Sequence, residues 1–412
     1  MTLDTLERRY LNGTFAELCR IESPSGREYD CARRVIAELR ALGVEVHEDQ
    51  AGAVAGSNCG NLLAHISGRP DVPSESVSEG PGRWRGHGAE LAGGGERRLS
   101  VLLCAHLDTV PLQAPVEPVL VDDGWENAGE GILGADNKAA VAVMLALARR
   151  VCRDGAPVDV ELLFTVGEET ALAGARAFDV SSLRSDFGYV FDHASPIGEM
   201  ILASPSHFRI QATFRGTAAH AGVRPEQGSS AILAAARAIA GMSLGRLDAE
   251  TTVNVGTISG GTAMNVVPER CTLDAEVRSL SDERAEAVVA EVIDCVHDAA
   301  NLPECDCDVD VAVERTFSGY RLAPGARAVR AAETALRGCG YQPVPTTSGG
   351  ASDANALVAR GFETVNLANG TERNHEPGER VSVAALEGML DVALALLDAV
   401  AAGALTLDAD RS

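Results

Sequence analysis

Hydrophobic and polar positions in the first half of the chain follow two alternating patterns. Four segments have the pattern of strands: 61–66, 100–106, 159–166 and 187–192. Residues 27–42 have helical periodicity and end before Gly43, and residues 137–151 are apolar on nearly every face, which indicates a buried helix. The alternation predicts an α/β fold with a mixed, largely parallel sheet flanked by helices.

The pattern changes near Ser206, where strands and helices follow in the order βαββαβ. The expected strands are 208–214, 252–258, 271–278 and 309–313, and the expected helices are 226–243 and 281–299. This is the order of a ferredoxin-like α+β domain. The first pattern then returns, with elements expected at 324–337, 365–367 and 382–402.

The length of the chain fits this change of pattern. A chain of 412 residues is too long for one ordinary core and suits two domains, one inserted in the other. The later helix and strand patterns would complete the first sheet. We therefore predict a catalytic domain in two parts, 1–205 and 316–412, interrupted by a lid domain at 206–315.

The net charge of the chain limits the classes of molecule that we expect it to bind. With 35 basic and 59 acidic residues, the formal net charge is −24. So acidic a surface repels phosphate backbones and anionic lipid, and we therefore expect no nucleic acid and no membrane as a partner. Residues 68–95 are rich in Gly, Pro, Ser and Arg without periodicity, and we expect a mobile surface insertion there.

The first residues and the cysteines both favour a cytoplasmic location. Residues 1–12 are charged and lack the apolar segment of a secretory signal. The ten cysteines are dispersed, and several of them, such as Cys104 and Cys271, have apolar neighbours. This usage indicates reduced, buried thiols.

His106 and Asp108 follow an apolar strand pattern. Alternation along an extended chain puts them on the same side, and catalytic side chains of open α/β sheets collect beyond the carboxyl ends of strands. A carboxylate two residues from a metal-ligating imidazole can orient it. Taken alone, the pair is explained more simply as a surface His and Asp near a turn.

Three further acidic positions stand at strand or helix ends. Asp136 follows two glycines at the start of the buried helix, where it is either a ligand or an ordinary N-cap. Glu168 and Glu169 follow a strand, and chemistry suggests one as a ligand and one as a proton acceptor. Helix N-terminal acids favoured by the macrodipole are the alternative for this pair. Asp192 ends another strand, where His193 competes with it as a ligand.

A lone loop histidine, His375, completes the candidate set. It supplies a second imidazole to a site that otherwise has three carboxylates and one histidine. The five candidate ligands are His106, Asp136, Glu169, Asp192 and His375. Five ligands fit two divalent ions if one carboxylate bridges, and mixed imidazole and carboxylate ligation suits zinc, cobalt or manganese.

Four motifs in this order resemble the co-catalytic zinc exopeptidases related to carboxypeptidase G, aminoacylase and peptidase T. They are H-x-D-T-V-P at His106, G-A-D-N-K at Asp136, G-E-E at Glu168 and N-x-H-E at Asn374. The resemblance covers nearly the whole chain. Further segments look most like the peptidase T-like branch: G-T-A-A-H-A-G at Gly216, T-T-V-N-V-G at Thr251, G-G-T-A-M-N-V-V-P at Gly260, E-V-R-S-L at Glu276 and S-G-G-A-S-D-A-N at Ser348.

The resemblance implies a role for each candidate residue. One metal is held by His106 and Asp192 and the other by Glu169 and His375, with Asp136 bridging them. Glu168 is then the general base, and Asp108 orients His106. The family typically has a cis peptide bond after the bridging residue, here Asp136-Asn137.

Lid residues of this chain also match positions that face substrate in relatives. The implied substrate-binding residues are His220, Asn254, Asn265 and Arg278 in the lid, with Ser348 and Gly349 outside it. His220 is expected to polarise the scissile carbonyl, reaching the partner subunit's site, and Arg278 to clamp a peptide carboxylate. Ordinary strand-edge polar residues are the alternative interpretation of the lid set.

The function that the resemblance implies is a di-metal aminopeptidase acting on short peptides, tripeptides above all, as a homodimer formed through the lid. A metal-bridging water attacks the carbonyl after Glu168 takes its proton. One alternative is an amidohydrolase of the same fold that cleaves N-acyl amino acids or another small amide. A metal-dependent binding protein without catalysis is the other alternative.

Overall fold

The computed structural model describes residues 4–68 and 99–409 of the chain. Nearly all of the insertion expected at 68–95 therefore lies outside the described residues. The chain divides into two compact units, which we call unit 1 and unit 2. Unit 1 comprises residues 1–200, 324–345 and 361–412, and unit 2 comprises residues 201–323 and 346–360. The segment 206–315, expected to form the lid, lies within unit 2.

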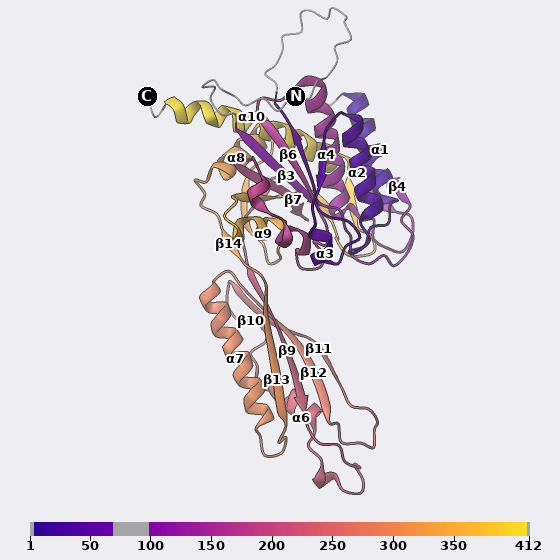
Figure 1. Cartoon of the computed structure of the whole chain (residues 1–412), viewed down its shortest axis with the longest axis vertical. Helices are drawn as coiled ribbons and strands as arrows, with labels where there is room; N and C mark the ends of the chain where they lie inside the picture. The colour runs from indigo at the N-terminus through magenta and orange to yellow at the C-terminus, as the bar shows by residue number, and fades with distance from the viewer. Residues whose placement is uncertain (1–3, 69–98, 410–412) are drawn as a thin grey trace, which may run out of the picture. The chain divides into compact units, whose positions relative to one another are not determined.

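The central sheet of unit 1 includes six neighbouring strands in the order β1-β2-β6-β3-β7-β16, of which β6, β3 and β7 are labelled in Figure 1. The last four of these strands run parallel, and β1 and β2 are antiparallel at one edge. Their bounds are Val46–Glu48, Leu62–Ile66, Asp159–Thr165, Ser100–His106, Phe187–His193 and Thr364–Ala368. The mixed, largely parallel sheet expected from the sequence is confirmed.

The central strands end together, and this places the candidate residues. All seven residues of β3 are buried, as the continuous apolar run of a strand covered on both faces requires. The last residue of β3, His106, is in register with the last residue of β6, Thr165. The residues that follow these strands therefore share the carboxyl edge of the sheet, where open α/β folds place their sites.

Helix α4 (Ala135–Asp154) packs on β3 and β7, and its first four turns are almost completely buried. Its neighbour α1 (Thr5–Cys19) was not expected from the charged N-terminal sequence. Asp4 caps α1, and the stripe of Leu11, Phe15 and Leu18 is buried. The remaining helices of unit 1 are α2 (Tyr29–Ala41), α3 (Ala51–Ala55), α5 (Ala173–Ala177), η1 (Val180–Ser182), α8 (Arg327–Gly338) and α10 (Val383–Ala409).

Unit 1 also holds a small antiparallel sheet that the sequence pattern did not predict. Its order is β17 (Thr371–Glu372), β18 (Arg380–Ser382), β5 (Gly124–Asn127) and β4 (Pro118–Val121). Strands of two to four residues are too short to leave a periodic signal. Within the described part of the chain, no helix is long and apolar enough to cross a membrane.

Unit 2 contains a five-stranded antiparallel sheet with the order β10-β11-β12-β9-β13. The strands are β9 (Ser206–Arg215), β10 (Gly245–Arg246), β11 (Thr251–Gly260), β12 (Arg270–Ser279) and β13 (Asp308–Phe317), with helices α6 (Ala231–Gly241) and α7 (Asp282–Ala300). Burial alternates along β9, so one face of the sheet forms a core with both helices. The ferredoxin-like lid expected from the sequence is confirmed.

One boundary in unit 2 differs from the expected one. The helix predicted at 226–243 begins only at Ala231, because the hydroxyl of Ser230 accepts a hydrogen bond from the backbone N–H of Leu233 and caps it. Pro225–Gln227 forms a separate 3-10 turn, η2. The other elements are β8 (Glu199–Ser204), β14 (Tyr320–Arg321), β15 (Val344–Thr347) and α9 (Asp353–Ala359).

Candidate metal centre

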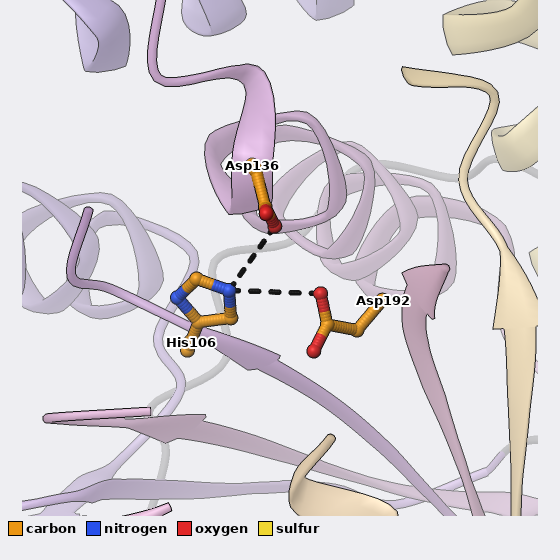
Figure 2. Close-up of side chains that lie close together, drawn as sticks. All are labelled: His106, Asp136 and Asp192. Carbon is orange, nitrogen blue, oxygen red and sulfur yellow. Dashed lines mark hydrogen bonds and ion pairs between the residues drawn. The ribbon is translucent and has the colours of Figure 1, made fainter. Parts of the chain in front are cut away.

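His106 lies at the carboxyl end of β3 with its ring buried (Figure 2). Its Nδ1 is 2.9 Å from the backbone oxygen of Asp108. Because a carbonyl oxygen only accepts, this bond places a ring proton on Nδ1, so Nε2 is the nitrogen that can offer a lone pair to a cation. Nε2 lies 3.2 Å from Asp136 Oδ1 and 3.6 Å from Asp192 Oδ1. A lone pair facing two carboxylates is the arrangement of ligands around a cation.

Asp136 does not cap helix α4. The N-cap is Gly134, and Asp136 has non-helical backbone angles just inside the helix. The peptide bond Asp136-Asn137 is cis, as the family resemblance implied. While Oδ1 faces His106, Oδ2 lies 3.2 Å from His375 Nε2. Each carboxylate oxygen therefore faces a different imidazole, which is the geometry of a bridging ligand.

Glu169 and His375 form the other side of the cluster. His375 Nε2 is 2.8 Å from Glu169 Oε1, an oxygen that is buried and has no hydrogen bond of normal geometry among the described residues. Ligand atoms of Asp136, Glu169 and His375 lie within 4.8 Å of one another, and so do those of His106, Asp136 and Asp192. The two triads share Asp136.

Burial and the neighbouring charges shift the pKa values of this cluster in opposite directions. Burial lowers the pKa of His106, but its contacts with Asp108, Asp136 and Asp192 outweigh burial and raise the pKa well above its usual value. The facing carboxylates of Asp136 and Glu169 raise the pKa of His375 to about 10. Burial acts against the charged form of Asp136, yet the two imidazoles lower the pKa of Asp136 below its usual value. The carboxylates thus create a field that favours bound positive charge.

This donor set fits divalent metal ions. The two triads offer imidazole nitrogens and carboxylate oxygens without a thiolate, which suits zinc, cobalt or manganese. The buried Glu169 oxygen and the shared Asp136 carboxylate provide unused acceptor capacity at the points where two ions would be held.

Asp108 holds the loop that carries both glutamates. Its carboxylate accepts hydrogen bonds from the backbone N–H groups of Glu168 at 3.0 Å and Glu169 at 3.1 Å, and from the hydroxyl of Ser25 at 2.7 Å. Its Oδ1 is also 3.4 Å from His106 Nδ1. Burial raises the pKa of Asp108, but the contacts with His106 and these donors lower it below its usual value. Asp108 therefore contacts both His106 and the Glu168 loop.

Sequence reasoning missed Glu379, a buried carboxylate behind Asp136. Its Oε2 accepts hydrogen bonds from the backbone N–H groups of Leu133 at 2.8 Å and Gly134 at 2.7 Å, and its Oε1 from Asp136 at 2.8 Å. Burial raises the pKa of Glu379 to about 7, although these donors act in the opposite direction. No sequence signal links residues 243 positions apart.

Asp192, rather than His193, belongs to the ligand cluster. His193 Nε2 lies 3.7 Å from Glu199 Oε2. The side chain of Asn366, on β16, accepts from the backbone N–H of Asp192 at 3.0 Å and donates to its carbonyl oxygen at 3.1 Å. Asn366 was also missed, although a polar residue inside the apolar strand β16 was the available signal.

The residues expected to contact substrate form two groups in unit 2. His220 and Asn265 lie on adjoining loops, where the N–H of Ala221 donates to the Asn265 carbonyl at 2.9 Å. Arg278 donates to the Gly349 carbonyl at 3.3 Å and to Glu276 Oε2 at 3.1 Å. Asn254 is opposite Glu276 in the β11–β12 register.

Ser348, beside Gly349, belongs to the second of these groups. Its hydroxyl accepts a hydrogen bond from the N–H of Gly350 at 3.0 Å. His220, Asn254, Asn265 and Gly349 are exposed, whereas Arg278 and Ser348 are half-buried. Unit 2 therefore brings Arg278, Ser348 and Gly349 together at one place and His220 with Asn265 at another.

Known proteins match this chain along nearly its whole length. Residues 204–301 match the M20 peptidase dimerisation domain, and residues 89–222 match peptidase family M28. The chain is 34% identical to the solved aminopeptidase PepT of Bacillus cereus, with a TM-score of 0.81, covering 96% of this chain and 99% of that one. A solved tripeptidase of Staphylococcus aureus is 29% identical, with a TM-score of 0.85 and the same coverage.

A curated sequence supports the same relationship. The uncharacterized protein YqjE of Bacillus subtilis is 32% identical over 396 residues, which cover 96% of this chain and 99% of that protein. Peptidase T of Serratia proteamaculans is 26% identical over 385 residues, 90% of each chain. The chain therefore belongs to the M20 family of peptidases, in the peptidase T-like branch.

Proposed function

We propose that this peptidase is a di-metal aminopeptidase that removes the N-terminal residue from short peptides, with tripeptides as its main substrates. The observation that carries the proposal is the pair of ligand triads sharing Asp136, with Glu168 next to them. The solved relatives described as an aminopeptidase and a tripeptidase support the choice of substrate. Zinc is the proposed metal, with cobalt or manganese as alternatives.

Each residue of the cluster has a distinct task in this proposal. His106 and Asp192 would hold one ion, Glu169 and His375 the other, and Asp136 both. When bound, divalent ions supply Lewis acidity that polarises a carbonyl group and makes water a better nucleophile.

Glu168 and the lid would then serve the reacting groups. The carboxylate of Glu168 lies within 4.8 Å of candidate ligand atoms of His106 and Glu169, which supports a role in proton transfer. Glu168 takes the proton from the attacking water and returns it to the leaving amine. From the lid, His220 would polarise the scissile carbonyl in the partner subunit's site and Arg278 would bind the peptide carboxylate. Further contacts would come from Asn254 and Asn265 in the lid and from Ser348 and Gly349 outside it.

Variants of two neighbouring residues test whether Glu168 acts as the base and Glu169 as a metal ligand. Glu168→Gln should keep its metal and lose turnover by about 10²- to 10⁴-fold, the usual contribution of a general base. Glu169→Gln, one residue away, should lose metal as well. Metal content by mass spectrometry and turnover of a tripeptide are measured together. Wild-type turnover of Glu168→Gln would remove Glu168 from the proposed role.

A second candidate function is hydrolysis of a non-peptide amide. One component of the p-aminobenzoyl-glutamate hydrolase of Escherichia coli is 32% identical over 172 residues, 39% of this chain. A panel of tripeptides against N-acyl amino acids separates the two functions, because turnover of the acyl substrates alone would replace the peptidase proposal. An inactive protein that binds two ions would instead favour a metal-dependent binding protein.

The assembly and location of the protein are also proposed. The match of residues 204–301 to a peptidase dimerisation domain supports a homodimer formed through the lid. Light scattering of the full chain tests this, and a monomer would contradict it. The cytoplasmic location remains a prediction.

A further inference from the structure

Glu28 is a fully buried carboxylate at the start of α2 that the proposed mechanism does not use. Its Oε1 accepts hydrogen bonds from two backbone N–H groups, that of Gly26 at 3.0 Å and that of Gly167 at 3.1 Å. Its Oε2 accepts from the hydroxyl of Ser57 at 2.6 Å. A single side chain therefore ties the N-terminal segment to the residue just before Glu168.

Gly167 is the turning point of this loop. Its φ of +60° lies in the left-handed region, which favours glycine, and an added Cβ would meet the hydroxyl of Thr170 at 3.0 Å. The direction in which the chain leaves β6 therefore depends on how the Gly167 peptide is held. The only side chain that bonds its N–H among the described residues is that of Glu28.

Three successive N–H groups in this loop point to buried carboxylate oxygens. The N–H of Gly167 donates to Glu28, and those of Glu168 and Glu169 donate to the two oxygens of Asp108. Charge-assisted bonds of this kind are about twice as strong as bonds between neutral groups. The backbone that carries both glutamates is thus held by two buried acids, Glu28 and Asp108.

We propose that Glu28 is a positioning residue for the Glu168–Glu169 pair and acts through the backbone N–H of Gly167. The proposal rests on the proposed function of Glu168. Displacement of a catalytic group by about 1 Å lowers turnover by about 100-fold, so a loop held at three points benefits from each of them. The hydrogen-bond partners of the Glu28 carboxylate among the described residues are Gly26, Ser57 and Gly167, so it acts on the two glutamates through the backbone.

The chain contains a matched control at the opposite end of the same sheet. Glu161, on β6, is equally buried, and its Oε2 accepts hydrogen bonds from the N–H groups of Arg184 and Ser185. Glu161→Leu removes a buried carboxylate and its backbone bonds just as Glu28→Leu does. Only Glu28 bonds the loop of the candidate site, so the two variants separate positioning from general stability.

Three substitutions of Glu28 weaken its hydrogen bond with Gly167 to different extents. Glu28→Gln keeps an oxygen for both N–H groups and offers its amide to the Ser57 oxygen, so we expect it to stay within about fivefold of wild-type kcat. Glu28→Asp keeps the charge but is one methylene too short to reach Gly167, and Glu28→Leu removes both acceptors. We expect kcat to fall by about tenfold in Glu28→Asp and about 100-fold in Glu28→Leu, with KM nearly unchanged.

Hydrogen–deuterium exchange gives a readout that is independent of turnover. Peptides covering 164–171 should exchange faster in Glu28→Asp and Glu28→Leu, whereas in Glu161→Leu the faster exchange should appear at 183–187 with kcat retained. If Glu28→Leu does not fold, Glu28→Asp serves as the test. Wild-type kcat in a folded Glu28→Asp, or an equal loss of kcat in Glu161→Leu, overturns the positioning role.

Measuring Glu168→Gln in the same experiment distinguishes a failure of the positioning role of Glu28 from a failure of the proposed function. If Glu168→Gln is inactive while Glu28→Asp keeps full turnover and normal exchange, only the positioning role of Glu28 is wrong. If Glu168→Gln is fully active, the proposed base is wrong, and faster exchange at 164–171 in Glu28→Asp still reports whether Glu28 holds the loop.

Discussion

Apart from His375, whose side chain is 49% exposed, the candidate residues of the two units are held in different ways. In unit 1, His106 and Asp108 are 1% and 0% exposed, and each has partners from more than one element. In unit 2, His220 and Asn265 are exposed on loops, and the hydrogen bonds of Arg278 within the described residues go to one carboxylate and one carbonyl oxygen. Catalytic and metal-binding groups must be fixed in place before the substrate binds. Substrate-binding groups are in contact with water until the substrate displaces it.

The largest expected effect comes from the residue shared by the two triads. Asp136→Asn should abolish turnover and release metal, because an amide neither carries the charge nor bridges two ions as a carboxylate does. The lid variant Arg278→Ala should retain its full metal content. Mass spectrometry of dialysed protein measures both. If Asp136→Asn kept its full metal content, metal binding would not depend on this residue of unit 1, and the proposed difference between the two units would be wrong.

The next effect is expected at Glu379, whose two oxygens both accept backbone N–H groups. In Glu379→Gln the amide N–H₂ must face one of these donors, so metal affinity should fall by about 10- to 100-fold. Competition with a chelator measures this affinity. The control is Glu161→Gln, because a single oxygen of Glu161 accepts its bonds and the amide keeps it. Equal affinity in both variants would mean that Glu379 does not hold Asp136.

A smaller, substrate-dependent effect is expected in the lid. Arg278→Ala should raise KM for tripeptides by about 10-fold, the loss of a charge-assisted bond of about 1.5 kcal/mol. Peptides with an amidated C-terminus should show little difference between variant and wild type. Arg209→Ala, which removes another arginine of the same sheet, serves as the control. A uniform loss on both substrates would exclude a carboxylate clamp.

The smallest effect is a pH dependence of the metal-free protein. The pKa of His375 is raised to about 10 by Asp136 and Glu169. This stabilisation is fully present below the unfolded-state pKa of about 6.5 and is lost as pH rises through about 10. Thermal unfolding of chelator-treated protein between pH 6 and 10 should therefore show falling stability. His375→Ala should flatten this slope, and an unchanged slope in that variant would assign it to other groups.

Local sequence patterns predicted most of the fold, because the burial of a strand or helix determines which of its residues are apolar and how they are spaced. The apolar run of β3, the buried face of α4 and the βαββαβ order each leave a signal within a few residues. Where the signal is short or mixed, prediction was incomplete. The strands of the small sheet are two to four residues long, and the apolar stripe of α1 is hidden among charges.

The candidate ligands could be named from the sequence because each is a His or acid at the end of an expected element. Their roles in one cluster depended on topology, since β3, β6 and β7 bring distant residues to one edge. Ser25, Asn366 and Glu379 could not be named in this way. Their partners are backbone groups or acids far along the chain, and no periodicity reports such a contact.

The sequence by itself therefore determined the fold class, the family resemblance and the identity of the ligand candidates, because residue type and local period carry that information. Only the tertiary structure decided that Asp136 faces both imidazoles, that Asp192 rather than His193 joins His106, and that buried acids hold the glutamate loop. These are matters of distance between segments far apart in the chain. Packing sets such distances, and local preference does not.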